Sequence, residues 1–318
     1  MAHLVETMAF VRETPWHGLG NQLTPNQPIE RWITEAGMDW SINHSPVLFN
    51  VAGEEDLHIR NHSDSKVLYR SDTLAPLSVV SNRYQVVQPE EVLHFYKDLV
   101  EAGGFELETA GVLKGGKKLW ALARTGQEAL VKGGDRVKAY LLLATSCDGT
   151  LCTTAQFTSV RVVCNNTLQM AVANSSGAVK VPHSTKFDPQ AVKESLGIGL
   201  SAWDSFIGNI RDLASRPVSG LEATQFFSDV LDEQVLDIEG GPTSKAMQQV
   251  TALYSGTGMG ALLPGARGTA WGLLNAVTEY VDHQRRARSQ DYRLDSAWFG
   301  QGAQIKQKAL DSAIQLIA

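Results

Sequence analysis

The spacing of apolar residues changes near residue 188. Before this point, apolar and polar residues alternate or apolar residues form short runs between turn formers, and both patterns are typical of β-strands. After it, apolar residues recur every three or four positions, as on one face of a helix: Val192, Leu196, Leu200, Trp203, Ile207, Ile210 and Leu213. We therefore predict an α+β fold, in which a central antiparallel β-sheet with a long hairpin is followed by a helical C-terminal region. The predicted domains are residues 1–187, an N-terminal arm with a mixed α/β sheet, and residues 188–318.

Residues typical of turns and helix caps predict where individual helices and hairpins begin and end. Asp148-Gly149 between two apolar runs predicts a tight hairpin turn. Pro89 followed by two acids predicts the start of a helix that ends before Gly103. Ser219 with Glu222 three residues later predicts a capping box at the start of another helix. Further helices are predicted over residues 29–36, 168–173, 188–216, 221–236, 244–254 and 269–288, and from about residue 304 to the end.

Composition limits the class of protein. The hydrophobic fraction of 43% is enough to bury a core, and the formal net charge of -6 argues against a surface that is basic throughout. The sequence has no run of about 18 apolar residues and begins with no secretory pattern, so no membrane association is expected. Its three cysteines suit a reducing compartment. Together these features predict a cytoplasmic protein.

Positive charge gathers in the strand region. Residues 114–138 hold seven lysines and arginines against Glu128 and Asp135. Basic residues with an aromatic among them on strands favour a groove that follows phosphates and stacks bases. The alternative is a solvated sheet face with lysine-protected edges. The predicted nucleic-acid-binding residues are Lys117, Lys118, Trp120, Arg124, Lys132, Arg136, Lys138 and Arg161.

Arg161 is included because it stands late in a strand, before Asn165-Asn166 and the start of a predicted helix capped by Thr167. A guanidinium and backbone N–H groups at such a place can hold a phosphate. The alternative is that the asparagines only end the strand, with Arg161 paired to a carboxylate.

Other candidate sites have simpler interpretations. Cys147, Cys152, Cys164 and His183 lack the spacing of metal-ligand pairs, so we expect buried structural thiols and a histidine held in a turn. The glycine-rich loop 255–268 lacks the lysine of a phosphate-binding loop, so we expect a flexible connection between helices that could order when a ligand or a neighbouring subunit binds. Glu279, Asp282 and His283 could converge on a metal ion in a nuclease, but the same spacing is typical of ion pairs along an exposed helix.

Four stretches in fixed order carry a family resemblance. They are residues 15–20 (PWHGLG), 81–89 (SNRYQVVQP), 161–168 (RVVCNNTL) and 268–283 (GTAWGLLNAVTEYVDH). Through them the chain resembles the phage/plasmid-like protein family, a group of unknown function carried by mobile elements. The resemblance implies a mobile-element protein and supplies no catalytic residue. The predicted sheet, with its long hairpin and following helix, also resembles the core of Rad52-like annealing proteins.

The leading hypothesis is a phage- or plasmid-encoded protein that binds and anneals single-stranded DNA in recombination. It would act without a cofactor, as a homo-oligomeric ring or filament whose subunit interface is built by the helices after residue 188. This function is more typical of a non-catalytic protein than of an enzyme. The alternatives are a metal-dependent nuclease or other hydrolase, and a phage protein that binds and inhibits a host defence factor.

Overall fold

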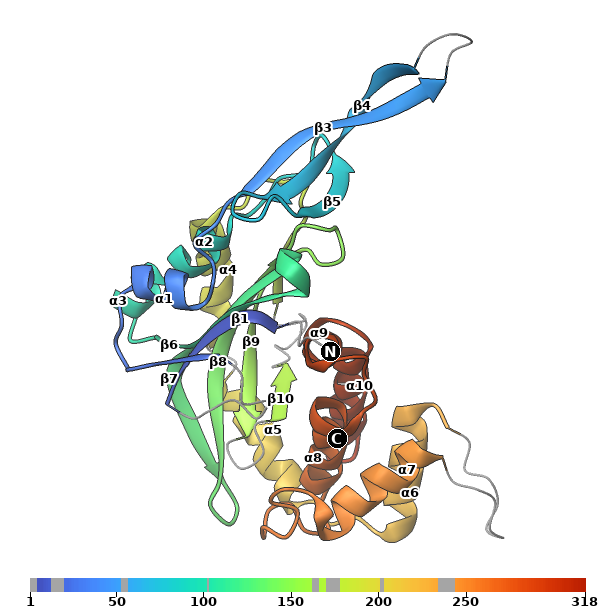
Figure 1. Ribbon diagram of the computed structural model, residues 1–318. Helices are drawn as coiled ribbons and strands as arrows, with labels where there is room; N and C mark the ends of the chain where they lie inside the picture. The colour runs from blue at the N-terminus through green and yellow to red at the C-terminus, as the bar shows by residue number, and fades with distance from the viewer. Residues whose placement is uncertain are drawn as a thin grey trace. The chain divides into compact units, whose positions relative to one another are not determined.

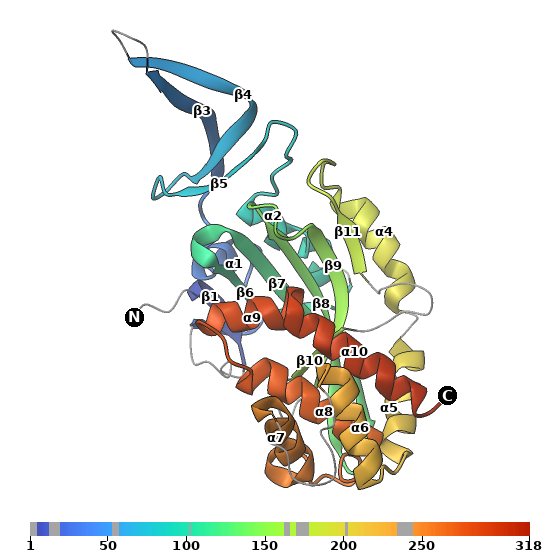
Figure 2. The ribbon, with the colours of Figure 1, turned by 90° about the vertical axis from the view of Figure 1, so that its right-hand side faces the viewer.

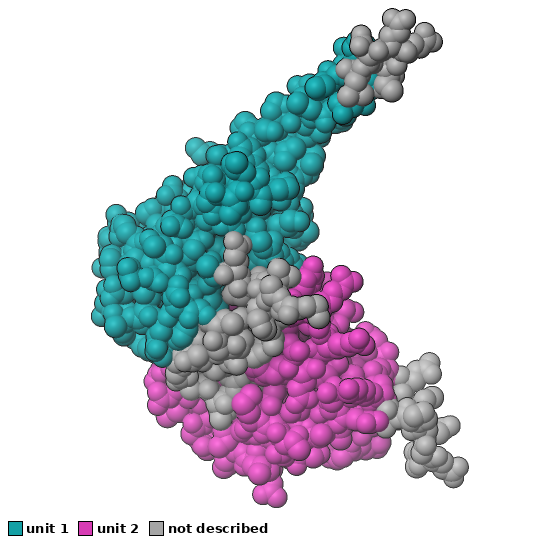
Figure 3. All heavy atoms as spheres, viewed as in Figure 1, with its two compact units in different colours: residues 1–125, 141–156, 178–196 teal, residues 126–140, 157–177, 197–318 magenta. Residues whose placement is uncertain are grey.

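The computed structural model describes residues 5–12, 20–52, 57–101, 103–161, 166–169, 178–200, 203–233 and 244–318. The chain forms two compact units, coloured separately in Figure 3. Unit 1 holds residues 1–125, 141–156 and 178–196, and unit 2 holds residues 126–140, 157–177 and 197–318. Both units are discontinuous along the chain, because strands in the middle of the sequence pass from one unit to the other. As a domain boundary, residue 188 stays a prediction.

The larger sheet confirms the predicted antiparallel core. Its strand order is β10-β9-β8-β7-β6-β1-β2, and β11 pairs with β9 beside this path. β6 pairs antiparallel with β1 and β7, and β9 pairs antiparallel with β10 and β11, whereas β1 and β2 are parallel. Its strands are β1 (Val5–Val11), β2 (Asn21–Leu23), β6 (Glu106–Leu113), β7 (Lys118–Val131), β8 (Asp135–Ser146), β9 (Thr153–Arg161), β10 (Asn166–Gln169) and β11 (Ala178–Val181). β7 and β8 form a long hairpin, and the turn predicted at Asp148-Gly149 joins the neighbouring strands β8 and β9.

A second sheet of three strands belongs to unit 1. Its order is β3 (Ile42–Ala52), β4 (Leu57–Arg70) and β5 (Pro76–Ser81), all antiparallel. β5 pairs only with residues 65–69 of β4, so β3 and β4 continue as a two-stranded ribbon beyond the end of β5 (Figure 1). Alternating residues predicted β3 over 40–51 and β5 over 77–80, close to the structure, but predicted only the two end segments of β4, over 57–59 and 67–69.

Short helices of unit 1 cover buried side chains. They are α1 (Ile29–Glu35), α2 (Pro89–His94) and α3 (Lys97–Glu101), and α4 (Pro189–Leu200) begins in the same unit. Gln88 and Glu91 form a capping box at the predicted start of α2. The single helix predicted after Pro89 is interrupted at Phe95 and Tyr96, which are both buried. The Tyr96 hydroxyl lies 2.8 Å from the Ala121 carbonyl oxygen, and burial raises its pKa well above the ordinary value.

Unit 2 is built around one buried helix, α8 (Ala270–Glu279), which lies among its neighbours in Figure 2. Every residue of α8 is buried, as expected of a helix that is apolar on most sides and central to a core. It packs against α5, α6, α7 and α10. These neighbours and the remaining helix are α5 (Trp203–Ser215), α6 (Gly220–Leu231), α7 (Lys245–Ala252), α9 (Gln290–Phe299) and α10 (Gln301–Gln315).

Several predicted helix boundaries change in the structure. The helix predicted over 168–173 is wrong where it is described, because residues 166–169 form strand β10 along β9, and residues 170–173 lie outside the described residues. The helix predicted over 269–288 ends in a π-helical turn over Tyr280–Gln284, after which α9 begins separately. The capping box of Ser219 and Glu222 is confirmed. Within the described part of the chain, no helix is both long and apolar enough to cross a bilayer.

Candidate nucleic-acid interface

Three of the eight predicted DNA-binding residues are buried. The exposed fraction is 4% for Lys118, 2% for Trp120 and 3% for Arg161. Residues 118–123 of β7 are all buried, so both faces of this part of the strand are covered. Trp120 therefore cannot stack on a base in this conformation, and we correct the prediction for these three residues.

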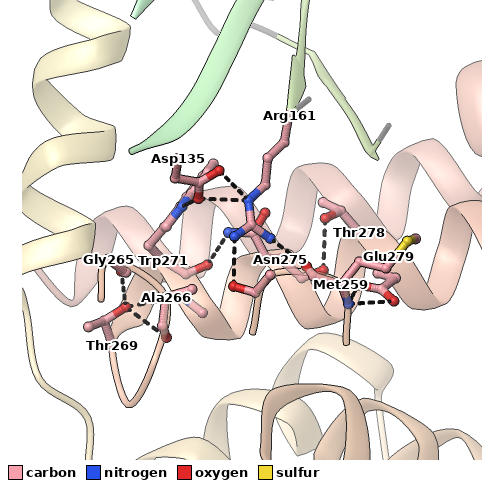
Figure 4. Close-up of polar contacts among 12 residues, drawn as sticks. Asp135, Arg161, Met259, Gly265, Ala266, Thr269, Trp271, Asn275, Thr278 and Glu279 are labelled. Atoms are coloured by element: carbon pink, nitrogen blue, oxygen red, sulfur yellow. Dashed lines mark hydrogen bonds and ion pairs between the residues drawn. The ribbon is translucent and has the colours of Figure 1, made fainter. Parts of the chain in front are cut away.

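Arg161 is held by a buried ion pair. Its Nε lies 2.7 Å from Oδ2 of Asp135, and the two side chains are 2% and 0% exposed (Figure 4). The two terminal nitrogens of the guanidinium donate to the carbonyl oxygens of Met259, at 3.1 Å, and Gly260, at 3.0 Å. Trp271 Nε1 donates to the same carboxylate at 3.0 Å. The guanidinium thus serves protein acceptors, and the alternative interpretation, a carboxylate partner, is confirmed.

This cluster fixes the glycine-rich loop 255–268. The Met259 backbone N–H donates to the Glu279 carboxylate at 3.0 and 3.1 Å, while the Met259 carbonyl accepts from Arg161. Burial raises the pKa of Glu279 above its ordinary value, although the Met259 N–H and the nearby cations oppose that shift. The loop is therefore anchored from both sides, where a flexible connection had been predicted.

The same loop packs on the turn between β7 and β8. A Cβ atom added to Gly133 would lie 2.5 Å from Cδ of Pro264, and one added to Gly265 would lie 2.6 Å from the Lys132 carbonyl oxygen. Gly133 also has φ +85°, a conformation that side-chain-bearing residues rarely adopt. Two glycines thus permit a close backbone approach that joins the loop to the hairpin end.

Exposed cations remain at this hairpin end. Lys132 and Arg136 are exposed, and Lys138 is half-buried on the same face of β8 as Arg136, because side chains two residues apart in a strand share a face. Arg136 lies 3.6 Å from Glu128, and both side chains are about half exposed, so this pair is weak in water. Arg267, two residues after Gly265, is exposed as well. We call Lys132, Arg136, Lys138 and Arg267 the basic hairpin end.

The other predicted cations belong to unit 1. Arg124 pairs with Glu108 at 2.5 Å, each side chain being 21% exposed, and Lys117 is half-buried. These residues were predicted to bind DNA because a count of charges along the chain does not show which acidic residues on neighbouring strands pair with them. The prediction missed Arg267, since only the packing of the loop on the hairpin turn brings that residue into consideration.

The residues considered for a metal site, Glu279, Asp282 and His283, do not converge, and the exposed helix that was the simpler interpretation is wrong, because Glu279 and Asp282 are buried. Asp282 Oδ1 accepts from Lys306 Nζ at 2.7 Å, with both side chains buried, and Glu279 accepts from the backbone of Met259. Burial lowers the pKa of Lys306, although the Asp282 carboxylate opposes that shift. Among the described residues, no group of three histidine, cysteine or carboxylate side chains is placed to hold a metal ion.

Of the remaining candidates, Cys147 and His183 are held by contacts within the protein. Cys147 is buried next to the carbonyl oxygens of Gly116 and Lys117, and burial raises its pKa to about 12. Cys152 is exposed, contrary to the prediction, and Cys164 lies outside the described residues. The ring nitrogens of His183 lie 3.0 Å from the Gln85 carbonyl oxygen and 2.9 Å from that of Leu151. His183 lies in a turn, as predicted, but its side chain joins two segments that are distant in the sequence.

The chain was compared with family models, curated proteins and solved structures. The family model described as "Domain of unknown function (DUF932)" matches residues 76–298, which include the β7–β8 hairpin, the Arg161 cluster and α8. No curated protein and no solved structure matches the chain. Because the matched segment covers more than half of the sequence, the chain belongs to the DUF932 family of uncharacterised domains.

Proposed function

We propose that this chain is a single-stranded DNA-binding protein that anneals complementary strands, and that the basic hairpin end provides its phosphate contacts. The observation that carries the proposal is the exposure of Lys132, Arg136 and Arg267 at the place where the glycine-rich loop packs on the β7–β8 turn. Neutralising phosphates with such side chains releases counterions, which drives binding without sequence preference. A phage or plasmid origin and a relationship to Rad52-like annealing proteins are parts of the same proposal.

Rigidity supports this assignment. The Asp135–Arg161 pair lies next to Arg136 in the chain and ties the hairpin end to Met259 and Gly260 of the loop. Charged side chains on a pre-organised backbone lose less entropy when they bind than side chains on a mobile loop do. The sequence of the hairpin end thus separates two tasks, with Asp135 buried for anchoring and Arg136 exposed for binding.

The test is the binding of a fluorescent oligothymidylate, measured by anisotropy over a range of salt concentrations. The variant Lys132→Gln/Arg136→Gln/Arg267→Gln should lose at least about tenfold in affinity, and the slope of log affinity against log salt should fall by roughly 2, since each phosphate contact on a single strand contributes about 0.7. A control of equal charge change is Arg31→Gln/Lys97→Gln/Lys186→Gln, three exposed cations of unit 1.

Annealing is tested with complementary oligonucleotides that carry a fluorophore and a quencher. The chain should accelerate pairing without nucleotide or metal, and the hairpin variant should lose this acceleration together with binding. The proposal fails if the chain does not bind single strands, if binding is insensitive to salt, or if the two triple variants lose affinity equally.

A further inference from the structure

The outer part of the β3–β4 ribbon exposes large apolar side chains. We call residues 47–51 and 58–62 the outer ribbon; in the described chain no third strand pairs with them. The exposed fraction is 60% for Leu48, 46% for Phe49, 42% for Val51 and 66% for Ile59. A two-stranded ribbon is at best marginally stable alone in water, and apolar side chains gathered on an exposed surface mark an interaction site.

The strand register sorts these side chains onto two faces. Leu48 pairs with Asn61, and Asn50 pairs with Ile59. Paired residues of an antiparallel ribbon share a face and alternate residues change face, so these four side chains lie together on what we call the uncharged face. The opposite, basic face carries Val47, Phe49 and Val51 beside His58, Arg60 and His62. Nothing on the uncharged face attracts a polyanion, which makes a protein the better partner there.

The uncharged face is complementary to itself. With residues about 3.3 Å apart along a strand and strands about 4.8 Å apart, Leu48 and Ile59 occupy one diagonal of the four positions and Asn50 and Asn61 the other. A twofold axis along the apolar diagonal places Leu48 against Leu48 of the second copy, and Ile59 against Ile59 of the second copy. The same rotation places Asn50 against Asn61 of the second copy. Apolar groups then meet apolar groups and amides meet amides, as an isologous contact requires.

We propose that the uncharged face docks on the same face of a second copy of this chain, related by that twofold axis. The contact is confined to a short ribbon, so its area is well below the roughly 1,200 Å² of a stable interface. The dimer should accordingly form and dissociate with protein concentration. The inference does not depend on DNA binding, and it places a self-association surface in unit 1, where the sequence had suggested the helices after residue 188.

Sedimentation velocity of the full chain over a range of concentrations is the first test. The wild type should shift from monomer to dimer as concentration rises, and Leu48→Ser/Ile59→Ser should raise the dissociation constant at least about tenfold. The matched control is Val79→Ser, because Val79 is 61% exposed on β5 of the same sheet but outside the outer ribbon. Circular dichroism verifies that each variant is folded.

Crosslinking tests the axis itself. In a Cys152→Ser background, Leu48→Cys should link to its own copy through a bismaleimide that spans the about 10 Å between stacked sheets. Val79→Cys should give no more dimer than the parent.

A wild type that stays monomeric, or a Leu48→Ser/Ile59→Ser variant that dimerises normally, overturns the inference. Loss of the dimer in Phe49→Ser/Val51→Ser with retention in Leu48→Ser/Ile59→Ser would overturn it by placing the contact on the basic face. If Leu48→Ser/Ile59→Ser weakens oligonucleotide binding at concentrations where the wild type is monomeric, the face binds nucleic acid and the inference also fails. None of these results decides the DNA-binding proposal, whose test is the basic hairpin end.

Discussion

Two hairpins of the described chain, β7–β8 and β3–β4, differ in the side chains that they expose to solvent. The end of the β7–β8 hairpin buries Asp135 and Val137 and exposes charged residues, and a loop packs on its turn through Gly133 and Pro264. The outer part of the β3–β4 hairpin has no third strand in the described chain and exposes apolar residues on both faces. Internal contacts thus fix the end of the first hairpin and leave Lys132 and Arg136 exposed. The second leaves large apolar side chains exposed.

The largest expected effect tests the anchoring of the first hairpin. Asp135→Ala would leave the Arg161 guanidinium buried without its carboxylate, and breaking such a pair costs about 3–5 kcal/mol. Urea unfolding measures this loss. Glu128→Ala is the control, because it removes the half-exposed partner of Arg136 and should cost at most about 1 kcal/mol. Equal losses for the two variants would show that Asp135 does not anchor the hairpin end.

The next effect concerns the turn glycines. Gly133 and Gly134 have φ +85° and +81°, but only Gly133 lies against Pro264, while nothing lies within 4 Å of a Cβ added to Gly134. Gly134→Ala therefore measures backbone strain alone, about 1–2 kcal/mol. Gly133→Ala adds the overlap with Pro264 and should cost about 1 kcal/mol more. Thermal or urea unfolding compares the two variants. Equal losses in the free energy of unfolding would mean that Pro264 moves away from the added methyl group without a loss of stability.

A smaller effect appears in the pH dependence of stability. Burial raises the pKa of Glu279 in the folded chain, so the folded state binds more protons than the unfolded state between the unfolded and folded pKa values. The stability contributed by protonated Glu279 is therefore present below the unfolded pKa and is lost as pH rises through the folded pKa.

Glu279→Gln should remove this dependence, so the melting temperature of the variant should rise relative to the wild type between pH 4.5 and pH 7. Differential scanning fluorimetry over this range measures the difference. A relative melting temperature that falls as pH rises would contradict the assignment, because it would mean that the folded state favours the Glu279 carboxylate over the acid.

Much of the fold follows from local sequence patterns. Pro89 with the two acids that follow it, the capping box at Ser219 and the break in hydrophobic period near residue 188 all rest on neighbouring residues, and the structure contains the elements that they predict. Local signals predicted a helix from residue 168, but residues 168–169 belong to strand β10, because pairing with β9 outweighs the local propensity of so short a segment.

The candidate site was less predictable, because ion pairs join residues far apart in the sequence. Arg161 and Asp135 are 26 residues apart, and Arg161 reaches Met259 across 98 residues. A count of charges cannot separate the buried Arg161 from the exposed Arg136 without knowing which carboxylate each one meets. The exposure of apolar side chains on β3 and β4 could not be predicted either. Alternation indicates that one face of a strand is covered, but it does not indicate which part of the molecule, or which partner, covers that face.

The smallest expected effect concerns the contribution of the outer ribbon of β3 and β4 to the stability of the isolated chain. If the outer ribbon contributes nothing to the isolated fold, then Leu48→Ser and Ile59→Ser should each change the free energy of unfolding by no more than about 0.5 kcal/mol in dilute solution. Leu68, buried in the inner part of the same strand β4, is the internal reference, and Leu68→Ala should cost about 2–5 kcal/mol. A large loss for Leu48→Ser at concentrations where the chain is monomeric would mean that the face is covered within one chain. Stability that depends on Leu48 only at high concentration would instead link the ribbon to association, because a partner that binds the folded chain stabilises it by mass action.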